Sequence, residues 1–160
     1  MSKNHPNKNF TTGTWFAIPL KSGGYAIGII TGGQSNIRLG YFFLDRFDDL
    51  PKSSDLKDLS ASKSSLIAWF SAKGFKQGRW IVLESNRAFK RAEWPVPRFA
   101  RVDVVDPTKG FIIEYDPNEP NHTQPLREIL CSSQETENLP YDGLFGVGAI
   151  ESKLDSTINL

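Results

Sequence analysis

The chain has few of the residue types on which most catalytic and metal sites depend. Its 160 residues include one cysteine, Cys131, and two histidines, His5 and His122. A single cysteine excludes an intrachain disulfide and a cysteine-rich zinc site, and two histidines are too few for the usual histidine-rich metal site. Cys131 lies in an apolar stretch, which is typical of an unreactive structural thiol. We therefore expect neither an enzyme nor a bound cofactor or metal.

Long apolar runs are also missing from the sequence. No stretch approaches the roughly 20 apolar residues that a membrane-spanning helix needs. The first ten residues, MSKNHPNKNF, lack the apolar core of a secretory signal. One cysteine in the whole chain fits a reducing compartment. We expect a cytoplasmic protein that has no membrane partner.

Motifs for phosphate binding and acid–base catalysis are absent as well. The glycine pairs at 23–24 and 32–33 lie between apolar runs, where they indicate hairpin turns rather than phosphate-binding loops before helices. Glu84 and Glu114 are the acids embedded in apolar stretches, and both fit the outward face of an alternating strand. A structural role is therefore favoured over catalysis for these two carboxylates.

Short apolar stretches rich in aromatic and β-branched residues are abundant, and glycine turns separate them. The sequence GTWFAIPLKSGGYAIGIIT at 13–31 predicts a β-hairpin, because Gly23 and Gly24 can adopt the positive φ of a tight turn. Pro19 cannot donate a ladder hydrogen bond, so it should lie at a strand edge or bulge. Further strands are expected over residues 37–44, 64–74, 79–85, 101–105 and 110–115.

The remaining segments complete the expected organisation. We expect the strands over 64–74 and 79–85 to pair with each other across a turn. Helix is expected in PLREIL at 125–130 and over 142–158, with Asp142 as the N-cap of the second helix. The pattern predicts a mainly β (α+β) fold, built as a curved antiparallel sheet or small partly open barrel with one or two C-terminal helices. Residues 1–11 should form a flexible tail, and residues 12–160 a single domain.

Charge is unevenly distributed along the chain, although the net charge is only +1. Residues 73–101 carry eight basic and two acidic side chains, whereas residues 103–151 carry ten acidic and two basic ones. We expect the two halves to face each other and cancel in the fold, an interpretation favoured over a single-signed patch. The aromatic residues of 73–101 superficially suggest nucleic-acid binding by base stacking. A near-neutral chain argues against a nucleic-acid partner.

Four motifs resemble the immunity protein 26 family, whose members are antitoxins of bacterial polymorphic toxin systems. The motifs are FAIPLKSGGYAIGII, GRWIVLES, WPVPRF and LFGVGAIESKL, which place family features at Ile18–Leu20, Gly78–Trp80, Pro97–Phe99 and Ile150–Leu154. The resemblance implies an immunity-type domain that binds and neutralises the toxin domain of a secreted bacterial effector without catalysis. The serine-rich, acidic stretch 45–64 departs from the family pattern and resembles an insertion.

An acidic loop is the first candidate for the partner-binding surface. Residues 45–64 read as a loop that holds a short helix at 56–60 capped by Asp55. A loop can vary without disturbing the core, which suits a specificity surface. The candidate partner-binding residues are Asp45, Asp48, Asp49, Asp55 and Asp58. A second acidic group comprises Glu135, Glu137 and Asp142, and the alternative function is a small β-barrel module that binds nucleic acid or peptide through 73–101.

Overall fold

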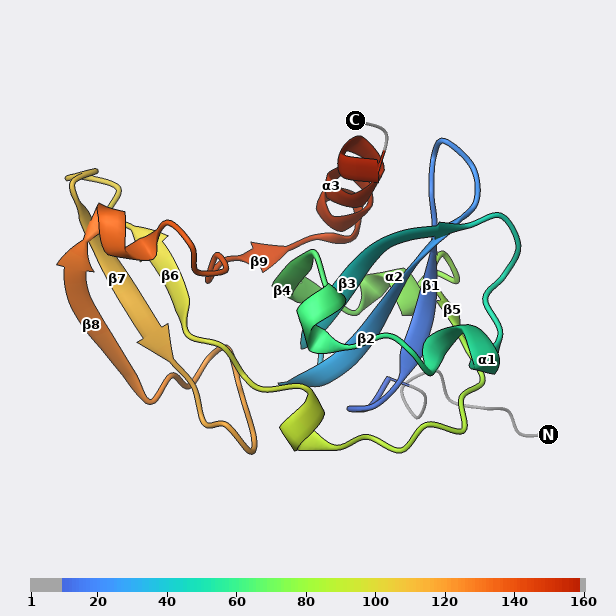
Figure 1. Ribbon diagram of the computed structural model, residues 1–160. Helices are drawn as coiled ribbons and strands as arrows, with labels where there is room; N and C mark the ends of the chain where they lie inside the picture. Colours follow the sequence, from blue (N-terminus) through green and yellow to red (C-terminus); the bar gives the residue numbers. More distant parts are fainter. Residues whose placement is uncertain (1–9, 159–160) are drawn as a thin grey trace.

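The computed structural model describes residues 10–158, which form nine strands in two sheets (Figure 1). The larger sheet has the order β5-β1-β2-β3-β4-β9 and the smaller sheet the order β6-β7-β8. Only the β4–β9 pair of these ladders is parallel. The larger sheet comprises β1 (Trp15–Pro19), β2 (Tyr25–Gln34), β3 (Ile37–Phe47), β4 (Leu66–Ser71), β5 (Ile81–Val82) and β9 (Leu144–Phe145). The smaller sheet comprises β6 (Phe99–Val102), β7 (Lys109–Glu114) and β8 (Arg127–Ser132).

Short helices connect the strands, and one longer helix ends the described chain. The α-helices are α1 (Ser53–Leu56), α2 (Lys73–Lys76) and α3 (Val147–Ile158), and the 3₁₀ helices are η2 (Ala61–Lys63), η3 (Arg91–Glu93) and η4 (Ser133–Thr136). Both sheets are open, because the described chain forms no ladder that closes either of them. The mainly β class with a C-terminal helix is thus confirmed. Of the expected flexible tail, residues 1–9 lie outside the described residues.

The predicted N-terminal hairpin is confirmed by the antiparallel pairing of β1 with β2. Gly23 and Gly24 form its turn with φ angles of 105° and 76°. A Cβ on Gly24 would lie 2.6 Å from the backbone oxygen of Phe47, so only glycine fits there. Pro19 ends β1 and is exposed, beyond the two residues of that strand that pair with β5. The missing amide hydrogen of Pro19 therefore leaves the sheet intact.

Aromatic residues pack on both faces of the larger sheet. Successive side chains of β1 point to opposite faces, so Trp15 and Phe16 enter different clusters. One cluster buries Phe16 with Phe42, Phe70 and Trp80 beneath α2 and α3. The other cluster, built around Trp15, comprises Tyr41, Phe43, Leu56, Leu59 and Trp94. Burying a strand on both faces explains why its apolar runs are nearly continuous.

The smaller sheet is attached through a third cluster. Phe99 of β6 and Ile113 of β7 are fully buried against Trp69 of β4 and Leu39 of β3. The rings of Trp69 and Phe99 lie 5.4 Å apart between centroids. The rest of this sheet extends away from the larger one, at the left of Figure 1. Its outer strand β8 is consequently the most remote from the core of the molecule.

The expected pairing of 64–74 with 79–85 is wrong. Residues 66–71 do form β4, but the connection after them is the helix α2 instead of a hairpin turn. Phe75 of α2 and the following Trp80 are buried beneath the sheet, so the chain crosses under it. Only Ile81 and Val82 then form a strand, and β5 pairs with β1 at the opposite edge from β9. Burial of the Phe75 and Trp80 rings therefore determines the path of residues 72–82.

Two helix predictions also need correction. Residues 127–132 form strand β8, because pairing with β7 along all six residues outweighs the local helical pattern. The C-terminal helix begins at Val147, and Asp142 is therefore not its N-cap. Leu144 lies in β9 and is 48% exposed, whereas Val147 and Leu154 are buried as the spacing predicted.

Burial of Trp80 predicts a large loss of stability on truncation. The indole is 3% exposed, stacks on Phe16 with ring centroids 5.4 Å apart, and donates from Nε1 to Glu151. Trp80→Ala should lower the free energy of unfolding by about 3–5 kcal/mol, measured by urea denaturation. Val104→Ala is the control, because Val104 is 95% exposed and its truncation should change stability little. Equal stability of the two variants would contradict the central position of Trp80.

Candidate partner-binding surface

The five candidate aspartates follow one another from the end of β3 to the segment after α1. Asp45 belongs to β3, which continues to Phe47, so the loop begins later than expected. All five side chains are exposed: Asp45, Asp48, Asp49, Asp55 and Asp58. We call residues 45–58 the acidic segment. It lies on the right of Figure 1, on the opposite side of the molecule from the smaller sheet.

The acidic segment has a net charge of −2, because Arg46, Lys52 and Lys57 oppose its five aspartates, but few of these aspartates are paired within the described chain. Asp48 forms one ion pair, at 3.6 Å with Arg46, and its side chain remains 91% exposed. Asp55 accepts a hydrogen bond from the backbone nitrogen of Lys52 at 2.8 Å, as the third residue of α1 rather than its N-cap. Among the described residues, the carboxylates of Asp45, Asp49 and Asp58 have neither an ion pair nor a hydrogen-bond donor. These three carboxylates are available to pair with a positively charged group of a partner.

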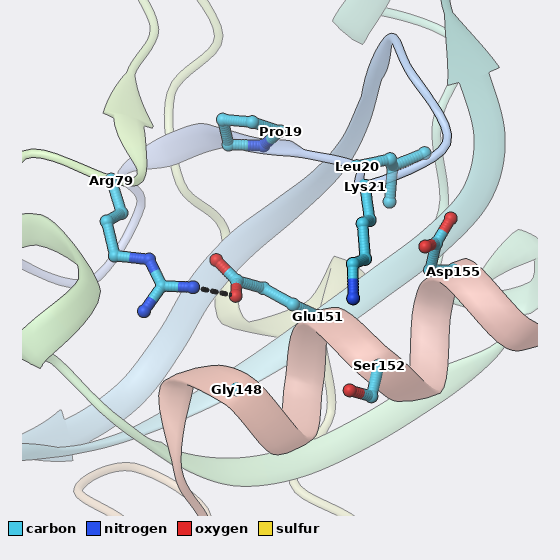
Figure 2. A pocket seen from close by; sticks show the side chains of 8 residues that line it. All are labelled: Pro19, Leu20, Lys21, Arg79, Gly148, Glu151, Ser152 and Asp155. Atoms are coloured by element: carbon cyan, nitrogen blue, oxygen red, sulfur yellow. Dashed lines mark hydrogen bonds and ion pairs between the residues drawn. The ribbon is translucent and has the colours of Figure 1, made fainter.

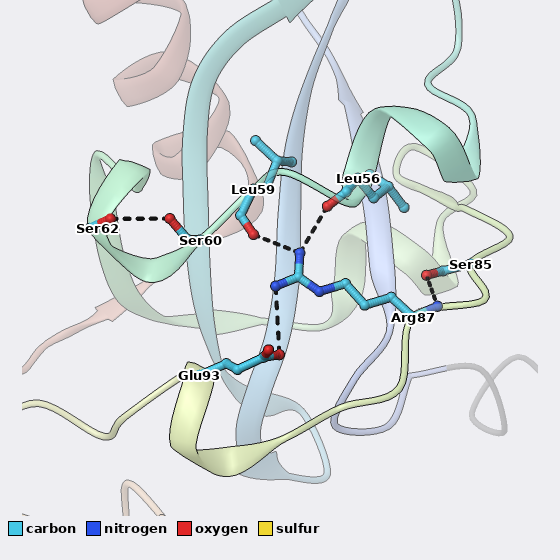
Figure 3. Close-up of polar contacts among 7 residues, drawn as sticks. All are labelled: Leu56, Leu59, Ser60, Ser62, Ser85, Arg87 and Glu93. Atoms are coloured by element: carbon cyan, nitrogen blue, oxygen red, sulfur yellow. Dashed lines mark hydrogen bonds and ion pairs between the residues drawn. The ribbon is translucent and has the colours of Figure 1, made fainter.

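Arg87 fixes the acidic segment to the core (Figure 3). Its guanidinium donates from Nη1 to the backbone oxygens of Leu56 at 2.8 Å and Leu59 at 2.6 Å. The same group lies 5.3 Å from the ring centroids of both Trp15 and Trp94. A planar cation can stack on aromatic faces and still donate in its own plane, which lysine cannot do. Arg87 thereby holds the backbone at Leu56 and Leu59 in one position against the core.

Further contacts give the acidic segment a fixed backbone. The side chains of Leu56 and Leu59 are buried in the cluster around Trp15. Glu93 lies 3.6 Å from Arg87 and balances its charge. The backbone nitrogen of Asn86 donates to Ser53 Oγ at 3.2 Å. Asp55 and Asp58 are therefore presented from an ordered scaffold, although the sequence predicted a solvated loop.

The basic segment 73–101 does not form the aromatic surface that single-stranded nucleic acid requires. Four of its five large aromatic side chains are buried in the three clusters, namely Phe75, Trp80, Trp94 and Phe99. The fifth, Phe89, is half-buried and covered by the guanidinium of Arg91 at 5.0 Å. Stacking of bases needs accessible ring faces. The geometry therefore gives no support to the nucleic-acid alternative.

The arginines of this segment are largely occupied by the acidic half of the chain. Arg98 lies 3.1 Å from Glu114, and Arg101 lies 2.8 Å from Glu128. Arg79 forms an ion pair with Glu151 of α3. Three of the eight basic side chains of 73–101 thus pair with the acidic half, in line with the favoured interpretation of the charge distribution. In the acidic segment, by contrast, such compensation is sparse.

The second acidic group does not form a patch. Asp142 is buried, accepts a hydrogen bond from the Tyr115 hydroxyl at 2.5 Å, and lies 3.9 Å from Arg101. Burial raises the pKa of Asp142, and burial together with the Asp142 hydrogen bond raises the pKa of Tyr115. Glu135 accepts from the backbone nitrogen of Ser132 at 2.9 Å and so caps η4. Glu135 and Glu137 are both exposed, but without the buried Asp142 they are only two acids.

Cys131 lies on β8 rather than in a helix, and it is half-buried. Burial and then the nearby carboxylate of Glu135 raise the pKa of its thiol, which lowers the thiolate fraction at neutral pH. His122 is occupied elsewhere, with Nε2 at 2.7 Å from the backbone oxygen of Asp142. Across residues 10–158, no group of three or more His, Cys, Asp or Glu side chains is placed to hold a metal ion. Nor does any helix in that range have the length and apolarity to span a membrane.

A cleft of about 600 Å³ between the β1–β2 turn and α3 was not apparent from the sequence (Figure 2). Residues far apart in the chain line it, including Leu20, Arg79, Glu151 and Asp155. Two polar contacts cross it: Arg79 pairs with Glu151, and Ser22 Oγ donates to Asp155 at 2.6 Å. They join α3 to the segment before β5 and to the β1–β2 turn, so these residues have a structural role.

The anchoring role of Arg87 can be tested in the isolated protein. Arg87→Lys keeps the charge but should lose the two-carbonyl contact and the stacking, so amide hydrogen exchange over residues 53–60 should accelerate about tenfold or more. Global stability should fall by about 1–3 kcal/mol, because buried carbonyls lose a charged donor. The control is Lys90→Arg, because Lys90 is exposed and donates no side-chain hydrogen bond within the described residues. Unchanged exchange over 53–60 in Arg87→Lys would refute the anchor.

Comparison with known proteins gives one match. The family model of immunity protein 26 matches residues 11–110, a range that holds the larger sheet through β5, the acidic segment and Arg87. Three of the four motifs lie inside this range, and the one at Ile150–Leu154 lies outside it. No curated protein and no solved structure matches the chain. Because the match covers more than half of the chain, the protein belongs to the immunity protein 26 family.

Proposed function

We propose that this protein neutralises a toxin domain by binding it in the cytoplasm, without catalysis of its own. Membership of the immunity protein 26 family carries the proposal. The chemistry of the described residues supports it, because the lone cysteine has a raised pKa and Glu114 is engaged in ion pairs with Arg98 and Arg127. The partner is the cognate toxin domain of a secreted bacterial effector. Binding blocks the toxin by covering or distorting its active site.

The acidic segment is the surface that first meets the toxin in this proposal. Its aspartates are exposed, sparsely neutralised and held on a scaffold that Arg87 makes rigid. Preorganisation lowers the entropy lost on binding, and a net negative surface charge accelerates encounter with a positively charged partner. A toxin that cleaves nucleic acid has a basic substrate cleft. A nuclease domain is therefore the toxin class that fits this surface best.

The proposal is tested first with the toxin domain encoded next to the gene of this protein. Cells that express that domain alone should stop growing, and co-expression of this chain should restore growth. The purified proteins should form a stable complex in which toxin activity is lost. A chain that fails to bind the domain, or that restores growth without binding it, would contradict neutralisation by binding.

Charge reversal tests the acidic segment separately. Asp48→Lys with Asp49→Lys should slow association with the toxin domain by about tenfold or more at low salt and flatten its salt dependence. Stability should change little, because both side chains are exposed. Stopped-flow association rates over a range of salt concentrations measure the effect.

The matched control is Glu119→Lys with Glu137→Lys, which makes the same charge change at exposed acids outside the acidic segment. It should slow association much less. The alternative that the basic segment docks onto the toxin is tested by Lys73→Glu with Lys90→Glu, since both lysines are exposed in that segment. If that pair abolishes binding while the aspartate reversals do not, the basic segment is the docking surface.

A further inference from the structure

Three of the four sheet edges in the described chain are short or covered, and one is open. The edge strands β5 and β9 contribute only two residues each. The outer edge of β6 is covered by the chain at 140–142, where Ala100 exchanges backbone hydrogen bonds with Pro140 and Asp142 at 2.9 Å each. Proteins usually protect sheet edges in such ways, because an open edge pairs with other strands.

The outer edge of β8 has no such protection. All six residues of β8 pair with β7 on one side, and no described strand pairs with the other side. The helix η4 that follows folds back over the sheet, where the Thr136 methyl group lies over Gly110 of β7, so it leaves the edge open. In Figure 1, β8 is the outermost strand of the smaller sheet.

The side chains of β8 do not protect this edge from pairing either. The charges of β8 are directed to its own sheet: Arg127 lies 2.5 Å from Glu114, and Glu128 lies 2.8 Å from Arg101. Leu130 is 61% exposed in the middle of the strand. Lysine, proline or a bulge, which would discourage pairing, is absent from these six residues. An open edge with an exposed leucine marks a pairing surface.

We propose that β8 pairs in antiparallel fashion with β8 of a second copy of this chain, joining the two smaller sheets into one of six strands. In the proposed register, Leu130 lies opposite Leu130 of the second copy. Ile129 then lies opposite Cys131, and Glu128 opposite Ser132. No like charges meet, and no charge faces an apolar side chain.

Registers centred on Ile129 or Glu128 are less favourable. A register centred on Cys131 avoids charge conflicts but places Leu130 opposite Ser132 instead of a second leucine. Centring on Ile129 places Glu128 opposite Leu130 and Arg127 opposite Cys131, so charges face apolar groups. Centring on Glu128 places two carboxylates opposite each other. In the Leu130-centred register, Leu130 also continues an apolar row across the sheet, because Phe111 of β7 is already its cross-strand neighbour. Two-fold symmetry makes the interface closed, as expected of a dimer.

Solution mass tests the dimer without any toxin. Light scattering after size exclusion, over about 10–500 µM protein, should show the mass rising from 17.9 kDa toward about 36 kDa. Leu130→Lys should remain monomeric at the highest concentration, because a lysine at this position opposes its own copy. Val104→Lys is the control: Val104 is 95% exposed but lies outside the strand, so this variant should dimerise as the parent does.

Cross-linking tests the register directly. In a Cys131→Ser background, Leu130→Cys should form a disulfide-linked dimer under a mild oxidant, because opposing residues of an antiparallel pair lie within disulfide reach. Leu126→Cys in the same background lies opposite residue 134 in this register and should not cross-link. The proposal is overturned if the parent stays at 17.9 kDa throughout, or if Leu130→Lys dimerises like the parent. Protection of β8 amides only on adding a toxin domain would assign the edge to the toxin instead.

Discussion

The opposite projection of Trp15 and Phe16 from strand β1 is the constraint on which the rest of this structure depends. Phe16 meets Phe42, Phe70, Phe75 and Trp80 at centroid distances of 4.9–5.8 Å. Trp15, its neighbour in sequence, meets Phe43 and Trp94 on the other face. Two adjacent residues thus centre two separate cores, and the sheet is held between them. The α3 helix belongs to the first core and the acidic segment to the second.

The core around Trp15 also explains how the acidic segment acquires its shape. Trp15 and Trp94 provide the aromatic faces over which Arg87 lies, and Arg87 binds the backbone of Leu56 and Leu59. The position of the aspartates around α1 therefore follows from packing beneath them. Conserving this packing while exchanging exposed side chains would alter partner choice without altering the fold. The same division between core and surface holds in the smaller sheet, where Phe99 and Ile113 attach it and β8 stays exposed.

Local sequence patterns were sufficient for the hairpin and for its core residues, but not for long-range pairing. Trp15, Trp80 and Phe99 lie in short apolar stretches of the sequence, and all three are 3% exposed or less. The partner of β5 could not be read locally, because it depends on the chain crossing under the sheet through α2. Strand β8 reads locally as helix, and only its pairing with β7 makes it a strand. The role of Arg87 was missed because its contacts are 28 and 31 residues away in sequence.

The central claim is that a rigid core presents the acidic segment to the toxin. Amide hydrogen exchange of this protein, free and in complex with its cognate toxin domain, tests that claim most directly. The account predicts that exchange slows on complex formation across residues 45–58, while residues 73–79 exchange at the same rate in both states. Protection confined to 73–101, with no change over 45–58, would contradict it.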